Sequence, residues 1–284
     1  MPLSDAAHRW ALPSLLTALA AGLVVALSAL PSPWEGMRPA SCMPDHCFCE
    51  GIRDGLVRQP ANTLSGLLFV CVGAWIVLVS GRSPGAHNLL AARPAYGRLM
   101  GGAAILVGVG TAFYHASLTF AGQTVDVLGM YLLVSFLLLY ALARLRPLRT
   151  RTLYAGYLLL NAGLLALLVT VPELRREVFA ALVLATLAAE AVLRARRRVR
   201  MRTGYLVAAV LALGLGFAAW VLDLRGTLCA PGSLLQGHAL WHAAGALATV
   251  FMFLFLRSER AGPEGESTDA VRGDPPIHTG LPGE

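Results

Sequence analysis

The sequence is poor in charged residues, and this shortage excludes a soluble protein. Charged residues make up 14% of the chain and lysine is absent, whereas a soluble domain carries roughly 25% charged residues. Hydrophobic residues make up 56% of the chain. Much of the surface must therefore face lipid.

Several familiar patterns are also missing. The alternation of polar and apolar residues that transmembrane barrels need does not occur. Neither does an HExxH, P-loop or GxSxG motif. The fold and the chemistry therefore have to be sought in long helices and in scattered polar residues.

The chain contains eight mostly apolar stretches. Most approach the ~20 residues that a helix needs to cross ~30 Å of hydrocarbon. Backbone groups in lipid must be satisfied within their own segment, so each stretch is expected to be a helix. The sequence thus predicts an all-α polytopic transmembrane bundle of seven or eight helices. The expected spans are residues 11–30, 61–80, 99–119, 124–143, 152–171, 178–193, 203–222 and 234–256.

Arginine is concentrated in alternate loops. Loops 81–98, 144–151 and 194–202 carry three, four and six arginines and no acidic residue, whereas loops 31–60 and 172–177 balance their arginines with acids. Cytoplasmic loops are enriched in basic residues, so the arginine-rich loops are expected inside and the others outside. This distribution explains the net charge of +7 without a nucleic-acid partner. Arginine in place of all lysine is typical of a GC-rich genome, and we expect a bacterial inner membrane.

These features predict three regions. Residues 1–30 form an N-terminal transmembrane anchor or uncleaved signal, with a cleaved signal peptide as the alternative. Residues 31–256 form the membrane domain. Residues 257–284, rich in glycine, proline and acids, are expected to be a disordered cytoplasmic tail.

Four of the five cysteines fall in predicted outer loops. Cys42, Cys47 and Cys49 lie in loop 31–60, and Cys229 lies in loop 223–233. An oxidising compartment allows disulfides to persist, so bonds among these four are expected.

Three histidines and one aspartate lie within the apolar stretches, apart from Glu190, which is near a cytoplasmic end and is expected to reach the interface. Such residues are costly in a membrane and mark functional sites. With the predicted topology, His115, His238, His242 and Asp126 all lie at a similar depth near the outer face, although they come from three helices. His238 and His242 are four residues apart and share a helix face. Hydrogen bonding to neighbouring helices is the alternative interpretation of each histidine.

Three imidazoles at one depth favour a metal site. Three protein ligands with one open position are the arrangement of catalytic zinc, while structural sites have four ligands. Imidazole also binds copper, nickel and iron, so zinc is the preferred ion among several. The predicted ligands are His115, His238 and His242.

The motifs around these residues resemble the alkaline ceramidase family, within the seven-helix membrane hydrolases that include adiponectin-receptor-like proteins. The similarity covers about residues 45–256, so the first helix is an addition to a seven-helix core. It is carried by Thr111-x-x-x-His115, Gln123-x-x-Asp126, Trp220-x-x-Asp223, His238-x-x-Trp241-His242, Asp45-His46-Cys47 and Asn62-Thr63-Leu64-Ser65.

The resemblance implies zinc on the three histidines, with Asp126 beside the reactive water and a hydroxyl from Thr111 nearby. It also implies a disulfide between Cys47 and Cys229. Animal members bind calcium in the first outer segment. Here Asp45 matches one ligand and Glu50 stands in place of an asparagine, but Phe48 and Gln59 stand where acids would be. Asp45 and Glu50 are therefore the candidate calcium ligands of an incomplete set.

These residues predict a zinc-dependent hydrolase of a membrane lipid amide, ceramide above all, with its site near the outer face. Asp126 would move the proton from water to the leaving amine, and Thr111 would donate a hydrogen bond to the oxyanion. No protein partner is implied. A receptor-like or lipid-binding protein with a structural metal is one alternative, and a hydrolase of another lipid is a second.

Overall fold

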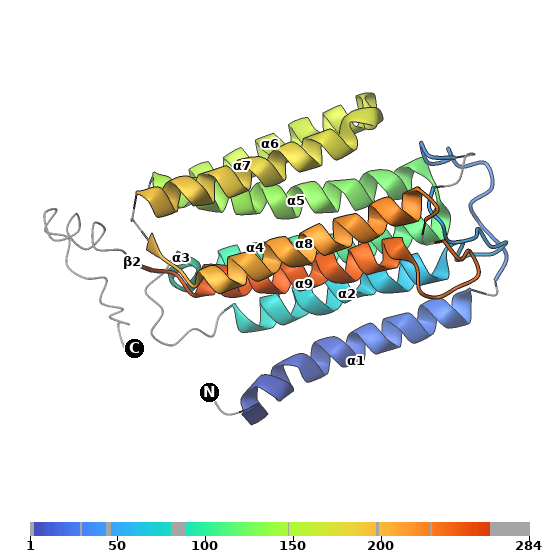
Figure 1. Ribbon diagram of the computed structural model, residues 1–284, viewed down its shortest axis with the longest axis horizontal. Coiled ribbons are helices and arrows are strands. Elements are labelled where there is room, and N and C mark those ends of the chain that lie inside the picture. Colours follow the sequence, from blue (N-terminus) through green and yellow to red (C-terminus); the bar gives the residue numbers. More distant parts are fainter. Residues whose placement is uncertain are drawn as a thin grey trace, which may run out of the picture.

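Long apolar helices dominate the fold (Figure 1). The computed structural model describes residues 3–28, 30–43, 47–80, 89–146, 148–196, 199–227 and 229–261. Within these residues, eight helices are long and apolar enough to cross a membrane. The chain is an integral membrane protein, and the predicted all-α bundle is confirmed.

The helices begin and end close to the predicted spans. The long helices are α1 (Leu3–Leu27), α2 (Pro60–Val79), α4 (Pro94–Ser117), α5 (Phe120–Leu145), α6 (Thr150–Thr170), α7 (Arg175–Ala195), α8 (Thr203–Leu224) and α9 (Gly237–Arg257). The short elements are α3 (Leu89–Ala92), η1 (Pro172–Leu174), β1 (Val199–Arg200) and β2 (Arg260–Ala261). Proline stands at the first position of α2, α4 and η1, where its missing N–H costs nothing.

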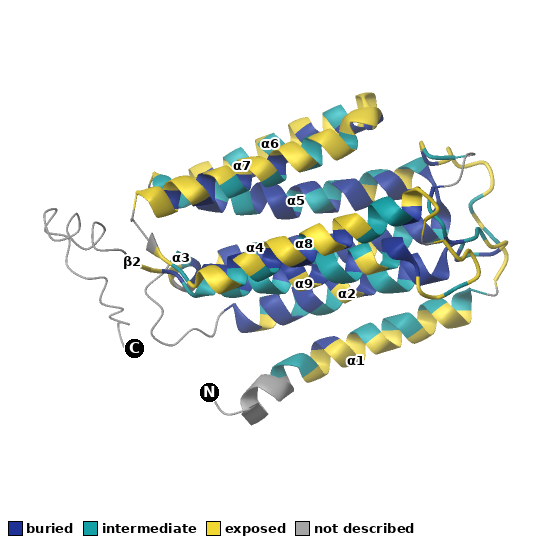
Figure 2. Ribbon diagram, in the orientation of Figure 1, coloured by how far each residue is buried: buried dark blue, intermediate teal, exposed yellow. Residues whose placement is uncertain are grey.

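Helix packing places α2, α4, α5 and α9 at the centre. Helix α2 packs against α4 and α9, α4 packs against α5, and α8 packs against α9. Helices α6 and α7 pack on α5, and α1 packs on α2. Figure 2 shows that α2, α4 and α5 carry most of the buried residues, whereas α1, α6 and α7 are largely exposed. The exposed faces are rich in leucine, as at Leu159 and Leu215, which suits contact with acyl chains.

The additional first helix lies against the outside of this core (Figure 1). Trp10 of α1 stacks on Trp75 of α2, with ring centroids 4.5 Å apart. The predicted seven-helix core with one extra helix therefore describes the packing. Retention of this helix in the mature protein stays a prediction.

The first residues of the predicted tail, 257–261, belong to the described part of the chain. Helix α9 continues to Arg257, and β2 then pairs antiparallel with β1, Val199 opposite Ala261. Glu259 is buried, and its carboxylate accepts a hydrogen bond from the Tyr140 hydroxyl. The rest of the predicted tail, residues 262–284, lies outside the described residues.

Candidate metal centre and lipid cavity

The three membrane histidines converge. His115 lies in the last turn of α4, and His238 and His242 lie in the first two turns of α9. The ring centroid of His115 is 4.9 Å from that of His238 and 5.1 Å from that of His242. The ring centroids of His238 and His242 are 4.4 Å apart. All three side chains are buried. The sequence-based depth argument therefore placed them together.

Gln59 fixes the orientation of the His115 ring. Its amide nitrogen donates to the Glu50 carbonyl at 3.0 Å, so its amide oxygen faces His115 and accepts from Nδ1 at 2.8 Å. Because an amide oxygen can only accept, Nδ1 carries the proton and Nε2 keeps its lone pair. His115 Nε2 is buried and has no hydrogen-bond partner.

Ser65 holds His242 in the same way. The Ser65 hydroxyl donates to the Asn62 carbonyl at 2.9 Å, so its oxygen accepts from His242 Nδ1 at 2.8 Å. The Nε2 atom of His242 is then the one with a free lone pair. His238 has a buried Nδ1 without a partner.

This arrangement fits a metal ion. One nitrogen from each ring can be chosen so that all three lie within 4.8 Å of one another. Zinc–nitrogen bonds are about 2.0–2.1 Å long, so small side-chain shifts would bring the three nitrogens around one ion. Buried imidazole nitrogens without partners are costly, and a cation would satisfy them. The hydrogen bonds on Nδ1 are also those that orient metal-binding histidines.

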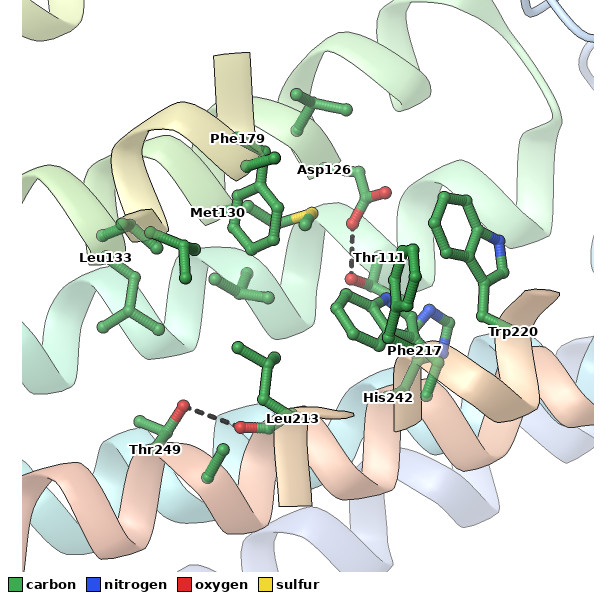
Figure 3. A pocket seen from close by; sticks show the side chains of 18 of the residues that line it. Thr111, Asp126, Met130, Leu133, Phe179, Leu213, Phe217, Trp220, His242 and Thr249 are labelled. Carbon is green, nitrogen blue, oxygen red and sulfur yellow. Dashed lines mark hydrogen bonds between the residues drawn. The ribbon is translucent and has the colours of Figure 1, made fainter. Parts of the chain in front are cut away.

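Asp126 lies beside this cluster and is held by Thr111. Thr111 is one turn before His115 on α4, and its hydroxyl donates to Asp126 Oδ1 at 2.5 Å (Figure 3). In this structure the Thr111 hydroxyl proton is thus donated to Asp126, and the predicted donation to a substrate oxyanion stays a prediction. Asp126 is in the second turn of α5, which begins at Phe120 with Thr119 as its cap.

A glycine allows α4 and α5 to approach closely at this point. A Cβ at Gly110 would lie 2.8 Å from the Val125 carbonyl oxygen and 2.9 Å from the Asp126 Cα. Such contacts are far inside van der Waals distance. The absence of a side chain at Gly110 thus permits the Thr111–Asp126 hydrogen bond.

The first outer segment is tied to the helices that carry the site. Both Glu50 carboxylate oxygens accept backbone N–H groups at the start of α2, from Ala61 at 2.6 Å and Asn62 at 2.9 Å. Burial raises the pKa of the Glu50 carboxyl, and these two backbone donors oppose the rise. Helix capping therefore accounts for Glu50 without calcium. Asp45, the other candidate ligand, lies outside the described residues.

The predicted Cys47–Cys229 disulfide is wrong. The bonds are Cys42–Cys47 and Cys49–Cys229. The Cys49 N–H donates to the carboxylate of Asp223 at the end of α8, at 3.0 Å, and this contact brings Cys49 to the loop of Cys229. Cys47 is buried two residues away and pairs locally. Disulfide bonds among these four cysteines are confirmed. The partner of Cys229, however, is Cys49, two residues after the predicted Cys47.

A cavity of about 550 Å³ inside the bundle is lined by His238 and His242 of the cluster. Its walls are almost entirely apolar side chains, including Met130, Leu133, Phe179 and Leu213 (Figure 3). The Thr249 hydroxyl donates to the Gly245 carbonyl of its own helix at 2.9 Å, so it adds no free donor to the wall. The volume lies in the range of small-molecule sites, and the lining suits an acyl chain.

The cavity lies between helices that hardly touch. Residues of both α7 and α8 line it. The backbones of α7 and α8 do not pack closely against each other within the described residues, and Arg176 of α7 contacts Trp220 of α8 through their side chains.

The sequence did not reveal the contacts of several residues around the site, two of which were noted only as departures from the family's pattern. Gln59 was noted as a departure from the calcium set, yet it contacts His115. Phe48, noted for the same reason, stacks on His238 with centroids 3.7 Å apart. Arg175 and Arg176 were interpreted only as loop charges, yet both line the cavity. No local sequence pattern connects these residues to the histidines, because the contacts depend on the fold.

One of two comparisons with known proteins finds a match. A comparison with curated proteins finds no match. A family profile described as ceramidase matches residues 56–273, more than half of the chain. The matched range includes the three histidines, Thr111 and Asp126. The chain therefore belongs to the ceramidase family.

Proposed function

We propose that the protein is a zinc-dependent intramembrane hydrolase that cleaves the amide bond of a ceramide-like lipid. The observation that carries the proposal is a buried cluster of three histidines, two of which, His238 and His242, line an apolar cavity together with the buried carboxylate of Asp126. Membership of the ceramidase family supports the choice of an amide substrate. Zinc held by His115, His238 and His242 would supply Lewis acidity, which polarises a carbonyl and makes water more acidic.

Asp126 is proposed to carry the proton. One carboxylate oxygen accepts the Thr111 hydroxyl, and the other accepts no hydrogen bond from the described residues. A carboxylate held in this way can take a proton from water and return it to the leaving amine. Thr111 then acts by fixing the direction of the Asp126 side chain.

The cavity is proposed to hold the acyl chain of the substrate. A lipid entering between α7 and α8 would place its chain along Met130 and Leu133 and its amide near the histidines. Phe48, which stacks on His238, would restrict water from the side of the outer loop. The site would then receive the substrate directly from the bilayer.

The test is turnover by the purified full chain in detergent micelles. Zinc content is measured first, and the release of fatty acid from N-acylsphingosine is then followed. We expect cleavage by the wild type and by Asp54→Asn, a change at an exposed outer-loop carboxylate. Cleavage should be lost in His238→Ala, and full activity in that variant would refute the assignment.

The main alternative is a receptor-like protein with a structural metal. Such a protein has no need of a buried base, so Asp126→Asn separates the two functions. Retained zinc with lost turnover supports the hydrolase. Zinc binding by a wild type that turns over no lipid amide supports the alternative.

A further inference from the structure

Two arginines stand at the polar end of the cavity. Arg175 and Arg176 begin α7 and both line the cavity that contains the histidines. Neither forms an ion pair with a carboxylate of the described residues. Arg175 donates to the Pro172 carbonyl at 2.8 Å, which uses one of the five N–H groups of its guanidinium. Most of the donors on both side chains are therefore available.

Trp220 connects Arg176 to the metal centre. The Arg176 guanidinium lies over the Trp220 ring, 4.9 Å from its centroid. The Trp220 ring is in turn 6.4 Å from that of His238. Stacking on an aromatic face fixes a guanidinium without using its hydrogen-bond donors. Arg176 is thus held near the reacting end of the cavity, with its N–H groups still free to bind.

Two neutral donors at the same end also have no partner. Gln123 lines the cavity, and its amide oxygen accepts from the Ser41 N–H at 2.9 Å and the Ser41 hydroxyl at 2.8 Å. Its amide nitrogen is buried and unpartnered, as is the indole nitrogen of Trp220. Unsatisfied buried donors cost free energy and are expected where a ligand supplies the acceptors.

The charge balance of the lining is positive. Asp126 is the single carboxylate among the described residues that line the cavity, against the two arginines. One of its oxygens is already occupied by Thr111. Glu177 is close enough to attract the charge of Arg176, and both side chains are exposed, but neither Glu173 nor Glu177 lines the cavity. Within the cavity, a neutral diol headgroup would bring no negative charge to the two guanidinium groups.

We propose that the arginine end of the cavity, formed by Arg175, Arg176, Trp220 and Gln123, binds an oxyanion on the substrate headgroup, so that the preferred substrate is an N-acyl lipid bearing a phosphate. Guanidinium groups bind phosphate and carboxylate oxygens through paired hydrogen bonds. The inference rests on the proposed function, because that function places the amide at the histidines. The carboxylate of the released fatty acid offers the same chemistry and is separated from the headgroup by experiment.

Binding is measured first, without turnover. The His242→Ala variant of the full chain is mixed with ceramide or ceramide 1-phosphate of identical chains, and the shift in melting temperature is recorded. We expect a larger shift with the phosphate lipid, and loss of the difference when Arg176→Gln is added. Arg225→Gln, at an exposed arginine of another outer loop that does not line the cavity, is the matched control. Equal shifts with both lipids would overturn the inference.

Turnover by the zinc-loaded protein gives the second measurement. We expect Arg176→Gln to raise KM for ceramide 1-phosphate by about tenfold or more, the usual weight of a charged hydrogen bond, and to raise KM for ceramide much less. Arg175→Gln should have the same selectivity if Arg176→Gln does not fold. Weaker inhibition by fatty acid in these variants, with no headgroup selectivity, would assign the arginines to the product and refute the inference. Absence of all turnover with intact phosphate-selective binding would refute the proposed hydrolase and leave the headgroup site standing.

Discussion

The role of Gln59 gives a sharp test of how the metal centre is built. Gln59 is fully buried, accepts from His115 Nδ1 and donates to the Glu50 carbonyl. In Gln59→Leu the His115 Nδ1–H loses its acceptor, and the ring is free to turn or to present the other tautomer. Loss of such a partner typically weakens metal binding by about 10- to 100-fold. That range corresponds to about 1.4–2.8 kcal/mol of binding free energy.

The assay is a zinc titration of the purified variant against a chelator of known affinity. Asn161→Leu serves as the control, because Asn161 is also buried and hydrogen-bonded, to Ser135 of the neighbouring helix, but does not line the cavity. Both variants should lose stability, and only Gln59→Leu should lose zinc affinity. Equal zinc affinity of Gln59→Leu and the wild type would refute the orienting role.

Three further changes follow from other contacts. Asp126→Asn should keep zinc and lower turnover by about 10²- to 10⁴-fold, the usual contribution of a positioned general base; loss of zinc in this variant would instead make Asp126 part of the metal centre. Gly110→Ala should destabilise the protein by about 1–3 kcal/mol through overpacking against α5. Gly102→Ala on the same helix, with nothing within 4 Å of its Cβ, should be neutral or slightly stabilising. Thermal unfolding in detergent measures both variants, and equal losses of stability would contradict the steric explanation. Cys49→Ser should destabilise the protein more than Cys42→Ser, by about 3 kcal/mol in the chain-entropy description. The reason is that Cys49→Ser breaks a disulfide with a sequence separation of 180, whereas Cys42→Ser breaks one with a separation of 5. The same unfolding assay measures both variants, and a greater loss of stability in Cys42→Ser would contradict the prediction.

The sequence predicted the helices and the meeting of the three histidines because both depend on strong local signals. A span of about 20 apolar residues must be a helix in lipid, and alternate arginine-rich loops predict the direction of each helix. From the predicted directions, the depth of His115 and of His238 follows by counting residues along the helix. The convergence of the histidines is therefore a consequence of topology as well as of resemblance.

The details that the sequence did not predict depend on tertiary contacts. Cys47 and Cys49 are two residues apart in the same segment, and tertiary hydrogen bonds, from the Cys49 N–H to Asp223 and from the Gly51 N–H to the Pro231 carbonyl, bring Cys49 to the loop of Cys229. Arg144 was counted as a loop charge, yet it is buried near the end of α5 and pairs with Glu190 of α7. Such a pairing joins positions far apart in the chain, and no local pattern reveals it.

The metal content of the purified full chain decides whether the three histidines form a metal site. We expect about one zinc ion per chain in the wild type, as for three histidine ligands and an open position. His115→Ala, His238→Ala and His242→Ala should each lose it, while Asp54→Asn keeps it. A folded wild type that binds no metal, or a His238→Ala variant with an unchanged zinc content, would contradict the account.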